Sequence, residues 1–236
     1  MGRVIGTGVL AAVAVVALAG CGSSHRDSLP ALGSPAVAPS VIAVPVTDSA
    51  ALAALLLGTA DLPSGYTATD DGTAPAGANP ADRSHTEPAA CANVLSAIWQ
   101  QVPGSTAHAA AHFETPAFDS VDIDIASYPG NGAADAFAAV QRLVHGCTSY
   151  SGTDADGTAV RYRIGGLSQP PIADASASFQ VVTTSSGMSL YSAATVAVTG
   201  SAVVQVAVTS PNKVDPGTLQ DLTAKQIRRL LGVPGP

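Results

Sequence analysis

The sequence predicts an α+β fold in which one antiparallel sheet is packed by helices. Apolar and polar residues alternate in several stretches between residues 121 and 209, as they do in half-buried strands. Short turns separate the last three of these stretches, so neighbouring strands should run antiparallel. Helical patterns precede, interrupt and follow the strands, and no internal repeat is visible. This order favours a single sheet with the helices on one of its faces.

The composition of the 236 residues fits one substantial domain with an alanine- and valine-rich core. Hydrophobic residues make up 47%, aromatic residues 4% and charged residues 11%, against about 25% charged residues in ordinary globular proteins. Lys and Arg number 10 and Asp and Glu 17, which gives a net charge of −7. A dedicated nucleic-acid-binding protein carries a basic face, so this charge excludes that class.

The domain begins with a short helix. Asp48 can cap a helix over residues 50–57, which Gly58 ends. Residues 61–66 then form a turn. Residues 67–88 are rich in Gly, Pro, Asp and Ala without a period, which predicts a loop of about twenty residues that is either mobile or functional.

A second helix should begin at Glu87-Pro88. The residues at helical spacing on one of its faces are Cys91, Leu95, Ile98, Trp99 and Val102. We interpret Trp99 as a core residue, and the alternative is a platform for a ligand.

The first strand pattern has one apolar and one acidic face. Its alternating residues are Val121, Asp122, Ile123, Asp124 and Ile125. This predicts a half-buried strand whose acidic face is exposed. Asn131 should cap the helix that follows, and Gly146 should end it. The buried face of that helix comprises Ala133, Phe137, Val140 and Val144.

The C-terminal part should form further strands and a last helix. Asp156-Gly157 is typical of a hairpin turn. The strand after it alternates inward-facing and basic residues, namely Val160, Arg161, Tyr162, Arg163 and Ile164. Three strands are expected around 176–184, 189–198 and 202–209. Pro216 suits the first turn of the last helix, whose inward residues should be Leu219, Leu222, Ile227, Leu230 and Leu231.

The N-terminus has the features of a secretory signal. Arg3 precedes an apolar stretch without charges over residues 4–18. The motif Leu18-Ala19-Gly20-Cys21 resembles the lipobox of bacterial lipoproteins, whose cysteine receives a diacylglyceryl group before cleavage in front of it. The resemblance implies a signal peptide over residues 1–20 and an anchor on the extracytoplasmic face of the cell membrane.

The organisation that follows from this is a tether and one domain. Residues 21–47 are polar and proline-rich, which predicts a lipidated, extended tether. Residues 48–236 then form the folded domain. The alternatives for Cys21 are an ordinary cysteine behind a cleaved signal or behind a short anchor helix.

Two cysteines remain in the domain, Cys91 and Cys147. An exported chain meets an oxidising environment, where an even pair most simply forms a disulfide. The pair would close a loop of 56 residues, which corresponds to roughly 4 kcal/mol of stabilisation, less any strain. The alternative is a redox or metal thiol pair, but no C-x-x-C spacing supports it.

No complete catalytic, metal or cofactor motif is present. His108 and His112 have a spacing that would place both on one face of a helix, near Glu114, but Ala109 stands where a zinc peptidase needs glutamate. We therefore interpret these histidines as solvated. The S-x-x-K match at residues 210–213 lacks its partner motifs. We predict no metal and no cofactor.

Arg161 and Arg163 are weak candidates for a ligand site, together with Trp99. Both arginines lie on one face of a predicted strand and could meet an anionic ligand. The alternatives are a solvated face or salt bridges to Asp122 and Asp124.

The chain resembles the extracellular sensor domain of PknH-type actinobacterial serine/threonine kinases, a family that includes free-standing lipoproteins. The matching features are Leu55-Leu56-Leu57 before Asp61-Leu62-Pro63, Cys91 opening a helix, the acidic strand that ends at Tyr128, and Ala134-Asp135-Ala136-Phe137 running to Cys147. The resemblance implies a strongly twisted sheet beside a cleft for an extracellular ligand. Kinase sensors usually carry two disulfides, and here only Cys91 and Cys147 can pair.

Three functions are compatible with these features. The first is a non-enzymatic lipoprotein whose domain binds a small molecule, glycan or glycolipid in a cleft. The second is an envelope interaction module that docks through its acidic strand face and exposes an apolar patch. The third is a hydrolase, which requires a histidine and a carboxylate to converge on a serine or cysteine.

Overall fold

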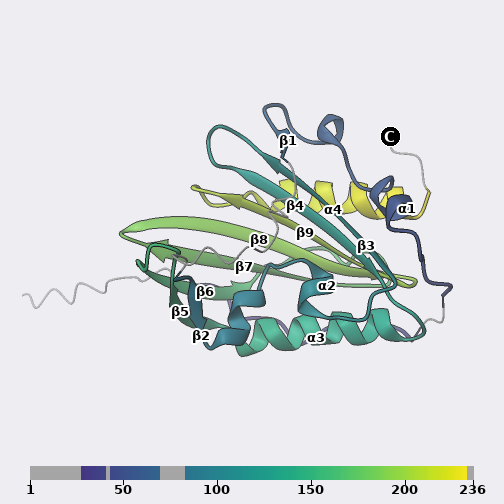
Figure 1. Ribbon diagram of the computed structural model, residues 1–236, viewed down its shortest axis with the longest axis horizontal. Helices are drawn as coiled ribbons and strands as arrows, with labels where there is room; N and C mark the ends of the chain where they lie inside the picture. Colours follow the sequence, from purple (N-terminus) through teal and green to yellow (C-terminus); the bar gives the residue numbers. More distant parts are fainter. Residues whose placement is uncertain (1–27, 41–42, 70–82, 233–236) are drawn as a thin grey trace, which may run out of the picture.

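One antiparallel sheet of nine strands runs through the computed structural model, which describes residues 28–40, 43–69 and 83–232 (Figure 1). Its spatial order is β1-β3-β4-β9-β8-β7-β6-β5-β2. The strands are β1 (Thr67–Thr69), β2 (His85–Glu87), β3 (Ala107–Glu114), β4 (Ser120–Ser127), β5 (Ser149–Thr153), β6 (Ala159–Gly166), β7 (Ala175–Ser185), β8 (Met188–Thr199) and β9 (Ala202–Ser210). The α+β class and the antiparallel sheet are confirmed.

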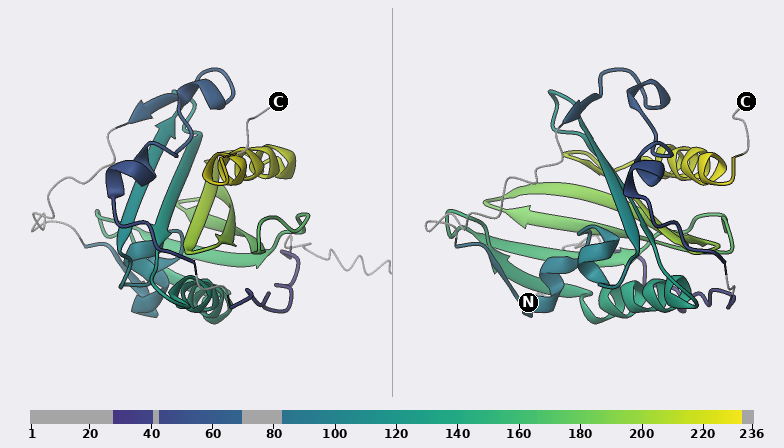
Figure 2. Two further views of the ribbon diagram at one scale, coloured as in Figure 1. Left: turned by 90° about the vertical axis from the view of Figure 1, so that its right-hand side faces the viewer. Right: turned by 45° about the vertical axis from the view of Figure 1, so that its right-hand side comes forward.

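The helices cover both faces of the sheet, so the expectation of helices on a single face is wrong. The helices are α1 (Ser49–Ala53), α2 (Ile98–Gln101), α3 (Gly132–Gly146) and α4 (Pro216–Leu230), with 3-10 turns η1 (Thr59–Asp61) and η2 (Ala89–Asn93). In Figure 2 the sheet separates α4 from α3. One core joins α1 and α4 to the sheet, and a second joins α2, η2 and α3 to its opposite face.

Helices cover both faces of the sheet because the central strands β8 and β9 are apolar on both faces. In β8, Ala193 and Ala197 belong to the core under α4, whereas Ala194 and Val196 belong to the core under α3. Apolar residues on both sides of a strand produce a nearly continuous apolar run. Residues 202–208 of β9 form such a nearly continuous apolar run, which indicates a strand covered on both faces.

The second predicted helix is two short pieces. The chain leaves η2 and reaches Leu95, whose φ of 67° is not helical, before α2 begins. A positive φ is costly for a leucine and interrupts a helix. Ile98 is buried, whereas Trp99 is only half-buried, so the shared apolar face of a continuous helix does not exist.

The remaining differences are local. The predicted loop over residues 67–88 contains β1 and β2 at opposite edges of the sheet, and residues 70–82 lie outside the described part. The strand β5 was not predicted from the sequence. Asn131 occupies the predicted N-cap position of α3, but its side chain makes no capping bond to a backbone N–H group and donates to Asp135 Oδ1. Leu231 is 58% exposed, not inward-facing. The predicted cap Asp48 accepts a backbone N–H group of α1. Asp215, which the sequence did not single out, accepts two backbone N–H groups of α4.

The predicted disulfide is present. Cys91 of η2 is bonded to Cys147, the residue that follows α3, and their Cα atoms lie 5.7 Å apart. The bond fixes η2 and the end of α3 to each other on one face of the sheet. Within the described residues, no helix is both long enough and apolar enough to cross a membrane.

Candidate functional site

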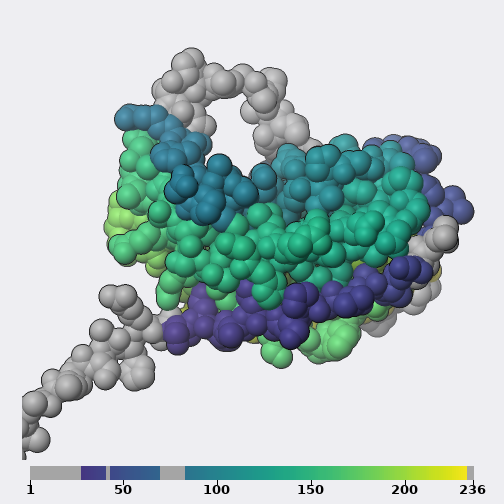
Figure 3. All heavy atoms as spheres, turned by 90° about the horizontal axis from the view of Figure 1, so that it is seen from below, coloured from purple at the N-terminus to yellow at the C-terminus, as the bar shows by residue number. Residues whose placement is uncertain are grey.

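The described part of the predicted tether does not stand away from the domain. Residues 28–40, here called the strap, lie along α3 on the outside of the molecule (Figure 3). Leu32, Ala36 and Ala38 pack against the core beneath α3. The expectation of a free, extended spacer is therefore wrong for these residues, because backbone and apolar contacts hold them on the domain.

Three hydrogen bonds fix the strap at two places. The side-chain amide of Gln141 on α3 grips Ala36 at both backbone groups: Ala36 N–H donates to Gln141 Oε1 at 2.7 Å, and Gln141 Nε2 donates to the Ala36 carbonyl oxygen at 2.9 Å. Gly166 N–H at the end of β6 donates to the carbonyl oxygen of Pro30 at 2.8 Å. The strap thereby continues the sheet edge where β5 has ended.

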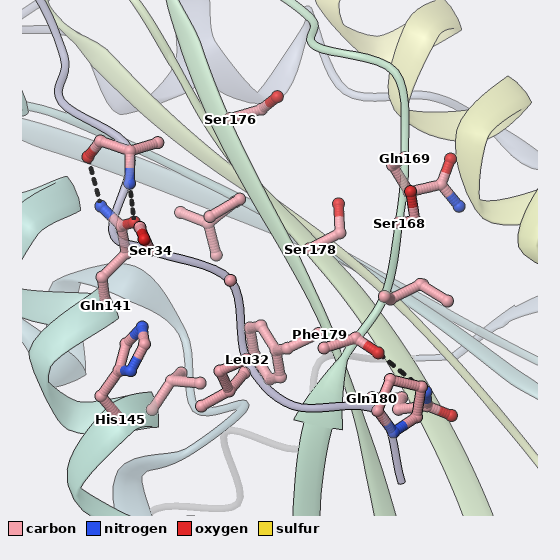
Figure 4. Close-up of a pocket in the computed structure, with 18 of the residues that line it drawn as sticks. Leu32, Ser34, Gln141, His145, Ser168, Gln169, Ser176, Ser178, Phe179 and Gln180 are labelled. Carbon is pink, nitrogen blue, oxygen red and sulfur yellow. Dashed lines mark hydrogen bonds between the residues drawn. The ribbon is translucent and has the colours of Figure 1, made fainter.

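A cavity of about 480 Å³, here called the strap cavity, lies between the strap, α3, β7 and the loop before β7 (Figure 4). Its apolar lining includes Leu32, Leu167, Phe179, Val140, Val144 and Val196. Figure 4 shows Leu32 of the strap beside Phe179 of β7 in the middle of the site. The volume lies within the usual range of small-ligand pockets.

The polar lining of the strap cavity is uncharged. It includes Ser34, Gln141, Ser168, Gln169, Ser178 and Gln180. None of the described lining residues is Asp, Glu, Lys or Arg, and His145 is the titratable side chain among them. Such a lining suits a neutral ligand that combines apolar faces with hydroxyl or amide groups.

Several of these polar groups also stabilise the walls. Gln180 Nε2 donates to the Gly166 carbonyl oxygen at 2.9 Å, and the hydroxyls of Ser178 and Thr195 lie 2.8 Å apart. Gln169 Nε2 donates to the carbonyl oxygen of Pro216 at 2.8 Å. The site is therefore built on strands and helices that hold its side chains in place.

The structure does not bring together the residues that the sequence suggested as ligand candidates. Trp99 stacks on His108, with ring centroids 4.3 Å apart, on the face of the sheet that carries α3. Arg161 and Arg163 are exposed on β6 and alternate with Ile164, which faces that same core. They therefore point to the opposite side of the sheet, and none of the three residues lines the strap cavity.

The suggested salt bridges of these arginines to β4 are excluded by the sheet order. Three strands, β9, β8 and β7, separate β4 from β6. Neighbouring strands lie about 4.8 Å apart, which places the two strands roughly 19 Å from each other. Asp122 instead pairs with His112, whose Nδ1 lies 2.7 Å from Asp122 Oδ1.

The predicted acidic outer face of β4 is also wrong, because α2 covers Asp124. This carboxyl is 4% exposed and accepts hydrogen bonds from Ile98 N–H at 2.7 Å and from Gln205 Nε2 at 3.1 Å. Burial raises the pKa of Asp124 to about 7, although the two hydrogen bonds act in the opposite direction. Asp124 attaches α2 to the sheet, so its carboxyl is not accessible to a partner protein.

The histidine pair lies on a strand, not on a helix. His108 and His112 lie four residues apart on the same face of β3. They have different partners, Trp99 and Asp122. Ser120 donates to Asp122 Oδ2 at 3.2 Å, so the carboxylate lies between serine and histidine. A hydrolase needs the histidine in the middle. Among the described residues, no three metal-binding side chains gather at one point.

A second groove, here called the hairpin-end groove, has an apolar rim that was not predicted from the sequence. It has a volume of about 780 Å³ between the β3–β4 turn, the β7–β8 turn and the end of β9. Its exposed apolar side chains are Phe118, 80% exposed, Met188, 73% exposed, and Leu190, 43% exposed. Only the sheet register brings the two turns together, so no local motif could have indicated this groove.

Comparisons with known proteins agree with this architecture. A family model described as PknH-like extracellular domain matches residues 47–232. The chain belongs to the PknH-like extracellular domain family. The resemblance inferred from the sequence is thereby confirmed, and this domain is of a type found outside the cell.

One solved structure supports the fold of this PknH-like domain. The crystal structure of the extracellular domain of PknH from Mycobacterium tuberculosis aligns with a TM-score of 0.60 at 16% identity, over 80% of this chain and 98% of that one. An X-ray structure of an uncharacterised Mycobacterium smegmatis protein aligns at 15% identity over 84% of this chain and 90% of that one. The TM-score of that alignment is 0.37. No curated protein sequence matches this chain.

Proposed function

We propose that this chain is a lipid-anchored extracytoplasmic protein whose PknH-like domain binds a neutral ligand in the strap cavity without catalysing a reaction. The observation that carries the proposal is the cavity itself, which combines an apolar interior with uncharged hydrogen-bonding side chains. A glycan or the sugar-bearing part of a glycolipid has this chemistry, since sugars present apolar ring faces and hydroxyl groups. Anionic ligands are disfavoured because none of the described residues that line the cavity is arginine or lysine.

A cavity-filling variant tests the proposal. Ser168 is exposed at the edge of the strap cavity, so Ser168→Trp should obstruct it without disturbing the core. Ser64→Trp is the matched control, because Ser64 is an exposed turn residue that does not line the cavity. The measurement is native mass spectrometry of each protein purified from a bacterial envelope. We expect a neutral molecule on the wild type and on Ser64→Trp that is lost from Ser168→Trp.

The lipid anchor needs a separate test, since Cys21 lies outside the described residues. Mass spectrometry of the mature N-terminal peptide should find a diacylglyceryl mass on Cys21. The variant Cys21→Ser should be released from membranes. An unmodified cysteine in the wild type would contradict the anchor but leave the ligand proposal intact.

A second candidate function is an envelope interaction module, and the hairpin-end groove favours it. An exposed cluster of large apolar side chains is typical of a protein-binding surface. Crosslinking in whole cells should then yield a product that Phe118→Asp abolishes and Ser64→Trp retains. Equal crosslinking of both variants would leave the strap cavity as the functional surface.

A further inference from the structure

The strap crosses the end of β6 at two consecutive glycines that leave it room. A Cβ atom on Gly165 would lie 2.7 Å from the Pro30 carbonyl oxygen, and a Cβ on Gly166 would be closer still to the carbonyl oxygen of Ala31. Neither glycine has a positive φ. Their backbone conformation is thus open to other residues, and what requires glycine at both positions is the close approach of the strap.

Gln141 provides a second feature that only the strap explains. It lies on the buried side of α3, 6% exposed, beside Phe137 and Val140. Its amide mimics a strand backbone, with one donor and one acceptor that both meet Ala36. Without the strap, Gln141 Oε1 would lose its partner, and Nε2 would keep only the long 3.5 Å contact with the Phe137 carbonyl oxygen of its own helix. The two glycines and the glutamine therefore form a binding groove for an extended peptide.

The strap itself adds little burial. No residue between 28 and 40 is buried, and its half-buried side chains are Leu29, Leu32, Ala36 and Ala38. Segments with few buried apolar contacts open at low free energy while the rest of the domain stays folded. A specific groove with a weakly held occupant is the arrangement expected of a releasable element.

We propose that the strap is a latch: an intramolecular peptide ligand of the groove formed by Gly165, Gly166 and Gln141, which closes one wall of the strap cavity. A ligand in the cavity that contacts the strap binds the latched state more tightly than the open one. By reciprocity it holds the latch closed. The groove accepts an extended segment of uncharged, mostly small residues with prolines, which is the composition of residues 29–38.

Release of the latch would change how far the domain reaches from the membrane, a step that rests on the proposed anchor at Cys21. With the strap docked, Leu29 lies eight positions after Cys21, and these eight Cα–Cα steps span at most about 30 Å. With the strap released, the next fixed point is Val44, whose carbonyl oxygen accepts from Ser201. Val44 lies 23 positions after Cys21, and these 23 Cα–Cα steps span up to about 80 Å.

Amide hydrogen exchange on the full chain, with no ligand added, tests the latch. The N–H of Ala36 reports the docked strap, and the amides of β9 report the fold. In Gly166→Ala, the added Cβ should expel the strap and speed exchange at Ala36 by about tenfold or more, with β9 unchanged. Gly146→Ala is the matched control, because a Cβ there meets nothing within 4 Å and Gly146 has no positive φ.

A second variant keeps the test decisive if Gly166→Ala disturbs the fold. Gln141→Met preserves the length of the side chain but removes both hydrogen bonds to Ala36, so exchange at Ala36 should again accelerate. Free-chain exchange at Ala36 in the wild type, or unchanged protection in both folded variants, would overturn the latch.

The change in reach is measured on the lipidated chain in phosphatidylglycerol vesicles. A fluorophore on residue 64 should move away from the bilayer in Gly166→Ala and not in Gly146→Ala. An unmoved fluorophore in a variant with a released strap would overturn the change in reach. An unmodified Cys21 would count against the proposed anchor, and the exchange experiment would still decide the latch.

Discussion

On each face of the sheet, a buried glutamine holds a preceding segment of the chain through hydrogen bonds to its backbone. The two held segments differ in how much apolar surface they bury. On α4, Gln226 Oε1 accepts from Leu57 N–H at 3.0 Å and its Nε2 donates to the Leu55 carbonyl oxygen at 2.9 Å. On α3, Gln141 makes the same pair of hydrogen bonds to Ala36. The polar chemistry is equal, so the difference must come from what surrounds it.

The segment held by Gln226 is anchored by buried leucines. Leu56 and Leu57 are 8% and 3% exposed, and Arg229 adds a bond to the Leu56 carbonyl oxygen and an ion pair with Asp61. The strap offers only half-buried side chains, namely Leu29, Leu32 and two alanines. Apolar burial contributes far more to docking than two hydrogen bonds exchanged with water. The α4 segment is therefore a permanent part of the core, whereas the strap can detach.

The largest predicted effect concerns the buried polar groups of the α3 face. Because burial raises the pKa of Asp124 to about 7, the folded state binds its proton more tightly than the unfolded chain does. The resulting stability is complete below about pH 4 and is lost as the pH rises to 7. Asp124→Asn does not titrate, so its free energy of unfolding should gain on that of the wild type by as much as about 4 kcal/mol over this range.

Urea unfolding at several pH values measures this difference. The control is Asp122→Asn, since Asp122 is not buried and pairs with His112 at the surface. A constant difference between Asp124→Asn and the wild type from pH 4 to pH 8 would show that Asp124 titrates normally.

The disulfide is predicted to matter almost as much, and only on the α3 face. Replacing Cys91 and Cys147 together by alanine opens a 56-residue loop and should lower the free energy of unfolding by about 4 kcal/mol. Because η2 and the end of α3 would no longer be linked, amides in α3 should lose more protection from exchange than amides in α4. Equal loss of protection in both helices would show that the two faces unfold as one unit.

Leucines of the two gripped segments should differ in importance. Leu57→Ala removes a buried side chain and should destabilise the fold by about 3 kcal/mol. Leu32→Ala removes a half-buried side chain of the strap and should cost less than about 1 kcal/mol in global unfolding. Both values come from chemical denaturation. A larger effect at Leu32 would mean that the strap belongs to the cooperative core.

The sheet was predictable because its long strands carry local signals. Strands β7, β8 and β9 were expected within two residues of their bounds, since glycines mark the turns between long β-rich runs. Pro216 likewise marked the start of α4. The short strands β1, β2 and β5 have too few residues to show a period, and their pairing is decided by neighbours distant in sequence.

The candidate site was not predictable, because its parts have no meaning until the fold assembles them. Gln141 appears in the sequence as one polar residue of an amphipathic helix, and Gly165-Gly166 as the end of a strand. The proline-rich strap has the composition of a spacer. Asp124 alternates with isoleucines as a solvent-facing residue would, and only the covering helix α2 reveals its burial. Sequence periodicity predicts which face a residue occupies, not what lies on top of that face.

The smallest and most direct comparison replaces each glutamine by methionine. Gln226→Met leaves Leu57 N–H and the Leu55 carbonyl oxygen without their partner in a segment that cannot leave, so global unfolding should become easier by about 1–3 kcal/mol. Gln141→Met should barely change global unfolding, because the strap can detach and its backbone groups then bind water. Chemical denaturation gives the first result, and hydrogen exchange at Ala36 gives the second. Similar global losses in both variants would mean that the strap is held as firmly as the α4 segment. The contrast between a permanent and a releasable grip would then be wrong, whatever ligand the cavity binds.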